Sequence, residues 1–161
     1  MSTAATGRFQ REELVGKYLT FALGNEEYSV PVLKVREIIK IMDITAVPQV
    51  PQYVKGVVNL RGAIIPIVDL RAKLAMPETT YNQFTVIIVV RVGAKTVGVV
   101  VDAVSDVLNI PITDVQPTPD FGAQVDARFI SGLARHGEKL VVLLDIDKVL
   151  GGDGALLASA S

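Results

Sequence analysis

Short apolar runs of strand length, separated by residues that favour turns, make up most of this chain. The runs are rich in β-branched side chains, which fit pleated, half-buried strands, and several alternate polar with apolar residues. In the first half this pattern predicts strands at residues 18–23, 27–32, 36–41, 57–61 and 64–68. In the second half it predicts strands at residues 84–92, 95–101, 105–110, 133–136 and 139–144. Short helical turns are predicted after Pro51 and at residues 70–74 and 146–150.

Residues 33–42 fit two interpretations. Val35, Ile38, Ile39 and Met42 match one face of a helix as well as a strand. The corresponding segment 104–110 is rich in Val and Ile and is followed by Pro111. Because proline stops a helix and the segment is β-branched, both places are predicted to be strands.

The two halves of the chain repeat one pattern. Residues 53–70 align without gaps on residues 129–146 at an offset of 76, which matches Tyr53 with Phe129, Gly56 with Gly132, and Asp69 with Asp145. Residues 28–39 align on 97–108 at an offset of 69, and Ile44-Thr45 aligns on Ile112-Thr113 at an offset of 68. The change of offset indicates a loop insertion at residues 116–122. Chance similarity of Val-rich strands is the alternative, and the ordered series of matched landmarks argues against it. Five short strands per repeat suit a small closed barrel, so an all-β protein of two barrels is predicted.

Composition excludes several classes of protein. Val and Ile supply 25 and 13 of the 161 residues, and half of the chain is hydrophobic, so a sizeable core is expected. Cys and Trp are absent, which rules out disulfides and a cysteine nucleophile. A net charge of −1 argues against a nucleic-acid partner or a polybasic membrane anchor. The apolar stretch 86–101 is interrupted by Arg91, Gly93 and Lys95, which predicts a hairpin and no direct membrane insertion. The N-terminus lacks the apolar region of a signal peptide, so a cytoplasmic protein is expected, with a flexible arm at residues 1–16 and a disordered tail at 151–161.

No convincing active site emerges from the sequence. His136 is the single histidine and lies in a predicted hairpin turn, where a solvated role is the expected one. Residues 93–96 resemble the end of a phosphate-binding loop but lack its leading glycine, and the aspartates are scattered at strand ends. No metal and no cofactor are expected. Two features remain. Glu37 and Arg61 are either exposed charges or an ion pair that orders a binding surface, and Phe121 is either a plug on its own barrel or a protein contact.

The motifs resemble those of the CheW family, the coupling proteins of bacterial chemotaxis. The similarity lies in residues 28–38, 44–48, 97–108 and 129–132, and above all in residues 56–71, GVVNLRGAIIPIVDLR. It covers roughly residues 17–150. The resemblance implies two five-stranded SH3-like β-barrels packed around a shared hydrophobic core, with the first strands paired to the last hairpin. It implies subdomains of about 17–50 plus 129–150, and about 51–128. It also implies a non-enzymatic adaptor that joins the cytoplasmic tips of chemoreceptors to the regulatory domain of a CheA-type histidine kinase, in the cytoplasm at membrane-associated arrays.

The resemblance also implies site residues. The receptor-binding positions that it matches are Val35, Glu37, Arg61, Val86 and Val107. The kinase-binding positions are Ile38, Met42, Ile44 and Phe121. Two alternatives stay open: an adaptor of the same kind in another chemosensory pathway, such as a pilus-type system, and a barrel that binds a small ligand between its two halves.

Overall fold

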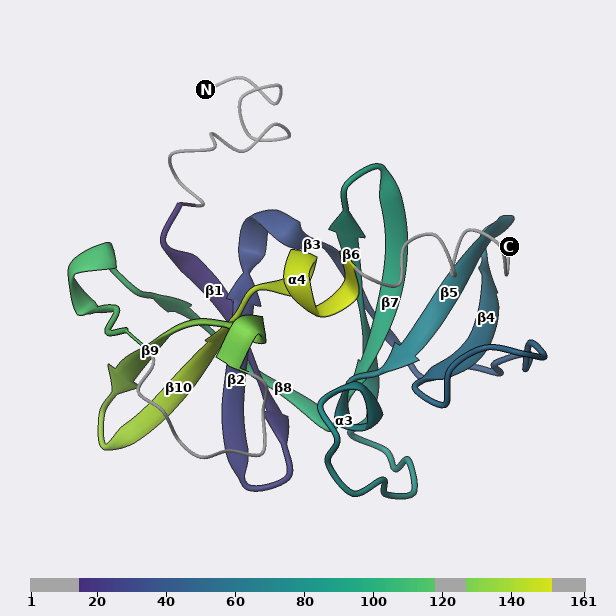
Figure 1. Cartoon of the computed structure of the whole chain (residues 1–161), viewed down its shortest axis with the longest axis horizontal. Coiled ribbons are helices and arrows are strands. Elements are labelled where there is room, and N and C mark those ends of the chain that lie inside the picture. Colours follow the sequence, from purple (N-terminus) through teal and green to yellow (C-terminus); the bar gives the residue numbers. More distant parts are fainter. Residues whose placement is uncertain (1–14, 118–126, 152–161) are drawn as a thin grey trace.

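The computed structural model describes residues 15–117 and 127–151 of the chain. Within these residues it consists of two five-stranded sheets with a few short helical turns, as the sequence predicts (Figure 1). The first repeat supplies β1 (Lys17–Leu23), β2 (Glu26–Pro31), β3 (Val35–Lys40), β4 (Val54–Leu60) and β5 (Ala63–Asp69). The second supplies β6 (Val86–Val92), β7 (Lys95–Val101), β8 (Ala103–Asn109), β9 (Ile130–His136) and β10 (Lys139–Leu144). The helical elements are η1 (Val32–Lys34), α3 (Leu70–Lys73), η2 (Ile112–Asp114), η3 (Ala127–Phe129) and α4 (Ile146–Gly151).

The segment 35–40 is a strand, which resolves the choice between helix and strand made from the sequence. The residues after Pro51 form a turn rather than a helix, closed by the N–H of Val54, which donates to the carbonyl of Pro51 at 2.9 Å. Two predicted strands begin three residues too late, because β4 starts at Val54 and β9 at Ile130. The pairing extends upstream of the clearly apolar run at both places, to the buried Val54 of β4 and the half-buried Ile130 of β9.

The repeats exchange strands. Barrel A has the strand order β8-β1-β2-β10-β9, and barrel B has the order β3-β6-β7-β5-β4. The first strands therefore pair with the last hairpin, as expected, through the parallel contact of β2 with β10. The predicted division of the chain places two strands in the wrong barrel: β3 belongs to barrel B, where it pairs with β6, and β8 belongs to barrel A, where it pairs with β1. The chain crosses between barrels directly after β2 and after β7, and periodicity carries no signal of such a crossing.

Both barrels are closed in the same way, at the matched glycines. In barrel B the segment after β3 returns to the far edge strand, where Thr45 bridges Val57 of β4. In barrel A the segment after β8 does so through Gln116 and Leu133 of β9. A Cβ at Gly56 would lie 2.0 Å from the Thr45 carbonyl oxygen, and one at Gly132 would lie 3.0 Å from that of Gln116. The repeated glycine thus permits the closing contact. In barrel A the closing residue is Gln116, whereas the sequence alignment matches Thr45 with Thr113. The difference arises because the turn η2 precedes Gln116.

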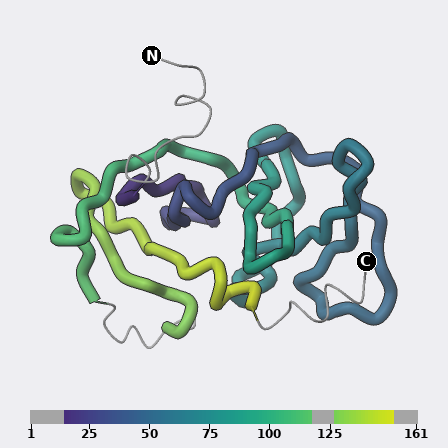
Figure 2. Tube along the Cα trace, turned by 90° about the horizontal axis from the view of Figure 1, so that it is seen from above, coloured from purple at the N-terminus to yellow at the C-terminus, as the bar shows by residue number. Residues whose placement is uncertain are grey.

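The two barrels lie side by side (Figures 1 and 2), and the largest core cluster contains residues of both. The largest buried cluster draws on β1, β2, β6, β7 and α4, and it includes Phe21 and Tyr28, whose rings stack at 6.4 Å between centroids. Smaller clusters fill the interiors of barrel B, around Ile67 and Ile87, and of barrel A, around Leu143. The expected shared hydrophobic core is therefore present, and it spans the seam where the two barrels meet.

Candidate functional site

An ion pair crosses the closure of barrel B. Arg61 occupies the two-residue turn between β4 and β5, where Asn59 Oδ1 accepts a hydrogen bond from the N–H of Gly62 at 2.9 Å. Its Nη2 pairs with Oε2 of Glu37 on β3. Of the two interpretations left open by the sequence, the ion pair is the one that is formed, and it links β3 to the turn between β4 and β5 of barrel B. The Arg61 side chain remains 67% exposed, so its guanidinium can contact a partner.

Two of the predicted receptor-binding valines lie at the seam. Val35 and Val86 are half-buried and pack against the shared core, at opposite ends of the paired strands β3 and β6. Val107 lies on β8 of barrel A, opposite Leu19, and is 52% exposed. The structure therefore brings Glu37 to Arg61 and both seam valines to one core, whereas none of the described contacts joins Val107 to the other four.

The outer face of β3 carries the predicted kinase-binding residues. Exposure alternates along this strand, so Arg36, Ile38 and Lys40 face outward. Ile38 and Met42 are 43% and 37% exposed, whereas Ile44 is half-buried and packs against the interior cluster of barrel B. Phe121 lies outside the described residues. We therefore find two of the four positions open to a partner on this face.

Phe84 belongs beside this face and was not foreseen as a site residue. It is 61% exposed just before β6. The β3–β6 ladder ends at the pair Lys40–Val86, so Met42 and Phe84 each lie two residues beyond the same end of this ladder. A large apolar side chain after the polar pair Asn82-Gln83 was the available signal, but the sequence pattern assigned it to the start of a strand. Phe84 and Met42 are therefore two exposed apolar side chains beyond the same end of the paired strands β3 and β6.

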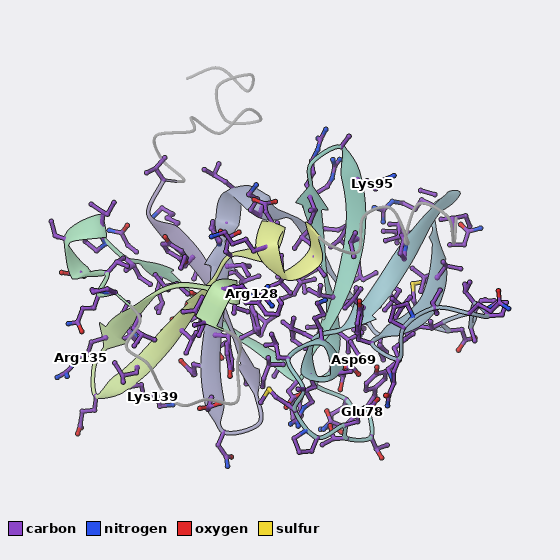
Figure 3. The ribbon with its side chains drawn as sticks, viewed as in Figure 1. Asp69, Glu78, Lys95, Arg128, Arg135 and Lys139 are labelled. Atoms are coloured by element: carbon purple, nitrogen blue, oxygen red, sulfur yellow. The ribbon has the colours of Figure 1, made fainter. Side chains whose placement is uncertain are left out.

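The described residues do not assemble an obvious catalytic group. His136 is exposed at the hairpin between β9 and β10. Within residues 15–117 and 127–151, no cluster of three or more metal-ligating side chains occurs, and no helix is long and apolar enough to cross a membrane. Burial raises the pKa of Tyr28 and of Tyr81, and the phenols donate to Glu26 and Asp69. These are structural contacts: the Tyr81 hydroxyl lies 2.7 Å from Asp69 Oδ2, and Asp69 caps α3 (Figure 3).

A second ion pair, between Arg71 and Asp102, joins the barrels and was missed in the sequence. Arg71 Nε lies 2.8 Å from Oδ1 of Asp102, and Nη2 lies 2.5 Å from Oδ2. The Gly24 N–H of barrel A also donates to Asp102 Oδ2, at 2.8 Å. The hydrogen bond from Arg71 lowers the pKa of Asp102, and the same bond raises the pKa of Arg71. The two residues are 31 positions apart, and only the strand exchange brings them together.

Comparison with known proteins identifies the family to which this chain belongs. The model of the CheW-like domain matches residues 17–153. The chain belongs to the CheW family. A chemotaxis protein CheW of Klebsiella aerogenes is 41% identical over 147 residues, which cover 91% of this chain and 89% of that protein. One of Helicobacter pylori is 32% identical and covers 91% of this chain and 89% of that protein. The scaffolding protein TtCheW from Thermoanaerobacter tengcongensis superposes with a TM-score of 0.78 at 29% identity, covering 84% of this chain and 87% of the solved one.

Membership in the CheW family confirms the resemblance and the fold inferred from the motifs. It places the chain among chemotaxis proteins of the scaffold or adaptor class. Protein FrzA of Myxococcus xanthus is also similar, at 29% identity over 83% of this chain and 84% of that protein. Membership does not by itself say which side chains contact which partner, so the site residues stay predictions.

Proposed function

We propose that this chain is a non-enzymatic adaptor that couples the cytoplasmic tips of chemoreceptors to the regulatory domain of a CheA-type histidine kinase. It would act in the cytoplasm, at membrane-associated receptor arrays. The observation that carries the proposal is the exposed Glu37–Arg61 pair of barrel B. An exposed pair of this kind adds at most about 1 kcal/mol to stability, so its value lies in fixing the position of a charge for a partner.

The receptor surface would comprise Val35, Val86 and the Glu37–Arg61 pair, with Val107 on the other barrel. The half-buried valines offer apolar contact at the seam, and Arg61 offers a charge that can be bound. Together they suit the apolar face of an amphipathic helix that carries an acidic or polar flank, which is the chemistry of a receptor hairpin. No enzymatic turnover is needed for such an adaptor, because binding alone can bias a partner's conformation.

The kinase surface would be the outer face of β3. Ile38 and Met42 supply exposed apolar area, and Phe84 supplies more beyond the end of the β3–β6 ladder. Phe121 is proposed as a further contact. Single interfaces of such transient complexes are modest in size, so repeated contacts in an array would supply much of the effective affinity.

The decisive experiment is a binding titration of the purified chain with a receptor hairpin fragment and, separately, with the kinase regulatory domain. We expect Arg61→Ala to weaken receptor binding about tenfold, equal to about 1.4 kcal/mol, and to leave kinase binding nearly unchanged. Ile38→Asp should show the opposite selectivity. Arg91→Ala is the matched control, because Arg91 is an exposed arginine of the same barrel outside both surfaces.

Circular dichroism should show the same fold for all three variants. Unaltered binding of both partners by Arg61→Ala and Ile38→Asp would contradict the proposed surfaces. Failure of the unsubstituted chain to bind either partner would contradict the proposed function itself. Titration against kinases of two chemosensory systems would show which pathway the adaptor serves.

A further inference from the structure

The strand exchange between the barrels raises the question of what selects it. Each repeat contains five strands and could close into a barrel of its own. In the structure the chain instead leaves barrel A after β2, through η1, and leaves barrel B after β7, through Asp102. The strands whose partners would change, β2, β5, β7 and β10, all bury apolar side chains, so apolar burial is available to either arrangement.

Charged residues at the two crossings provide a distinction. Arg71, the second residue of α3, pairs with Asp102 in the crossing after β7. Asp147, the second residue of α4, pairs with Lys34 in the crossing after β2, with Asp147 Oδ2 2.7 Å from Lys34 Nζ. Positions 71 and 147 correspond at the repeat offset of 76. The same place in each repeat thus carries opposite charge and meets opposite charge.

Parallel strand pairing determines which crossing each helix meets. β5 lies beside β7 with Asp69 opposite Val100, so α3 follows β5 toward the end of β7 and Asp102. β10 lies beside β2 with Leu143 opposite Ser29, so α4 follows β10 toward the end of β2 and Lys34. If each repeat closed on itself, β5 would pair with β2 and β10 with β7. Arg71 would then lie at the crossing that carries Lys34, and Asp147 at the crossing that carries Asp102.

We infer that the two ion pairs of reversed polarity, Arg71–Asp102 and Asp147–Lys34, select the exchanged pairing of the strands over self-paired repeats. Both contacts are attractive in the exchanged fold, and both would join like charges in the alternative. Such like-charge penalties are a known means of excluding a competing arrangement. The Arg71 side chain is only 13% exposed and its pairing is bidentate, whereas the Asp147 and Lys34 side chains are 46% and 37% exposed. The pair at Asp102 therefore carries the larger share. The identity of the proposed partners does not enter this inference.

A pair of variants with equal net charge tests it. R71D/D147K places like charges at both crossings of the exchanged fold and opposite charges at both crossings of the self-paired one. R71D/D147K/K34D/D102K carries the same two substitutions and restores attraction at both crossings with reversed polarity. Any loss of packing at positions 71 and 147 is common to both variants, so their difference reports the charge match.

We expect the melting temperature of R71D/D147K to fall by about 5–10 °C, given roughly 2–4 °C per kcal/mol for a chain of this size, and its refolding to be slow or incomplete. The fourfold variant should recover at least half of this loss, although the D102K substitution removes the acceptor of the hydrogen bond from Gly24. Nuclear Overhauser contacts between Ser29 and Leu143 and between Val68 and Val99 report the exchanged pairing, and they should be weaker in R71D/D147K and restored in the fourfold variant.

Equal stability and equal refolding of the two variants would overturn the inference, as would full retention of these contacts and of the melting temperature in R71D/D147K. Should R71D/D147K not fold at all, recovery of a folded protein by the two additional substitutions would support the inference. Failure of the fourfold variant to fold would overturn it.

Discussion

Replacing Gly56 by alanine should open barrel B. The backbone of Gly56 has φ +142°, and a Cβ built there lies 2.0 Å from the carbonyl oxygen and 2.7 Å from the carbonyl carbon of Thr45. Both are backbone atoms, so no side-chain rotation relieves the overlap. Thr45 and Val57 exchange two backbone hydrogen bonds of 2.9 Å at this point, and these form the closing bridge of the barrel. To clear the new methyl group, Thr45 must move far enough to break both bonds.

The expected loss follows from these contacts. Two backbone hydrogen bonds contribute about 1 kcal/mol each, and a positive φ costs a residue with a side chain about 1–2 kcal/mol. We therefore expect Gly56→Ala to lower the free energy of unfolding by about 3–4 kcal/mol, a large part of the roughly 5–15 kcal/mol typical of a domain. Urea denaturation followed by circular dichroism measures this as a lower midpoint.

Two other glycines serve as controls. Gly132 is the matched position of barrel A, where the first atom that a Cβ would meet is Cγ1 of Val115, at 2.5 Å, which can rotate away at some cost. Gly62 has φ +90° with open space around it, so Gly62→Ala carries only the cost of its backbone conformation. The expected order of destabilisation is Gly56, then Gly132, then Gly62. A Gly56→Ala variant as stable as Gly62→Ala would refute the argument from barrel closure.

Three further predictions concern single side chains. Asp102→Asn should destabilise the protein by about 1–3 kcal/mol near pH 7, because the hydrogen bonds of the charged carboxylate are lost. The pKa of Asp102 is lowered in the folded protein, so this stabilisation is complete above the unfolded pKa near 4 and disappears as the pH falls through the folded pKa. The difference in urea midpoint between Asp102→Asn and the unsubstituted protein should therefore shrink below about pH 4. Tyr81→Phe should cost about 1–2 kcal/mol in the same assay, because the buried carboxylate of Asp69 loses a donor. Phe84→Ser should weaken binding of the kinase domain several-fold, as measured by calorimetry. Leu140→Ser, which also replaces an exposed apolar side chain but on barrel A, should leave this binding unchanged.

The strands were predictable because their signals are local. Branched side chains, turn residues and the matched landmarks at Gly56 and Gly132 all lie within a few residues of the structure that they specify. The offset alignment matched Thr45 with Thr113, and the bridges that close the barrels form at Thr45 in barrel B and three residues after Thr113 in barrel A. It missed Gln116 there because the short turn η2 adds residues without changing the apolar pattern.

Membership of β3 and β8 in the two barrels was not predictable in the same way. In either arrangement most inward-facing residues are apolar, with Thr20 and Ser29 as buried polar exceptions, so the periodicity does not separate the two arrangements. The distinction lies in the charges of residues 34, 71, 102 and 147, and those charges become informative only when the parallel neighbours of β5 and β10 are known. For the same reason the Arg71–Asp102 pair was invisible in the sequence, whereas the Glu37–Arg61 pair could be foreseen from polar residues interrupting apolar strands.

The repeat also supports the proposed binding role of Arg61. The turns at Arg61 and Gly137 correspond at the offset of 76, and both residues have positive φ, +52° and +64°. In barrel A this position is a glycine, which adopts a positive φ freely. In barrel B it is an arginine, and a positive φ costs a residue with a side chain about 1 kcal/mol. The exposed ion pair with Glu37 stabilises the protein by less than this backbone strain costs, so stability does not explain why the position is an arginine. Arg61→Gly should therefore leave the free energy of unfolding unchanged or raise it by up to about 1 kcal/mol, while weakening receptor binding as much as Arg61→Ala does. A clear loss of stability in Arg61→Gly would mean that the arginine is kept for the fold and not for a partner.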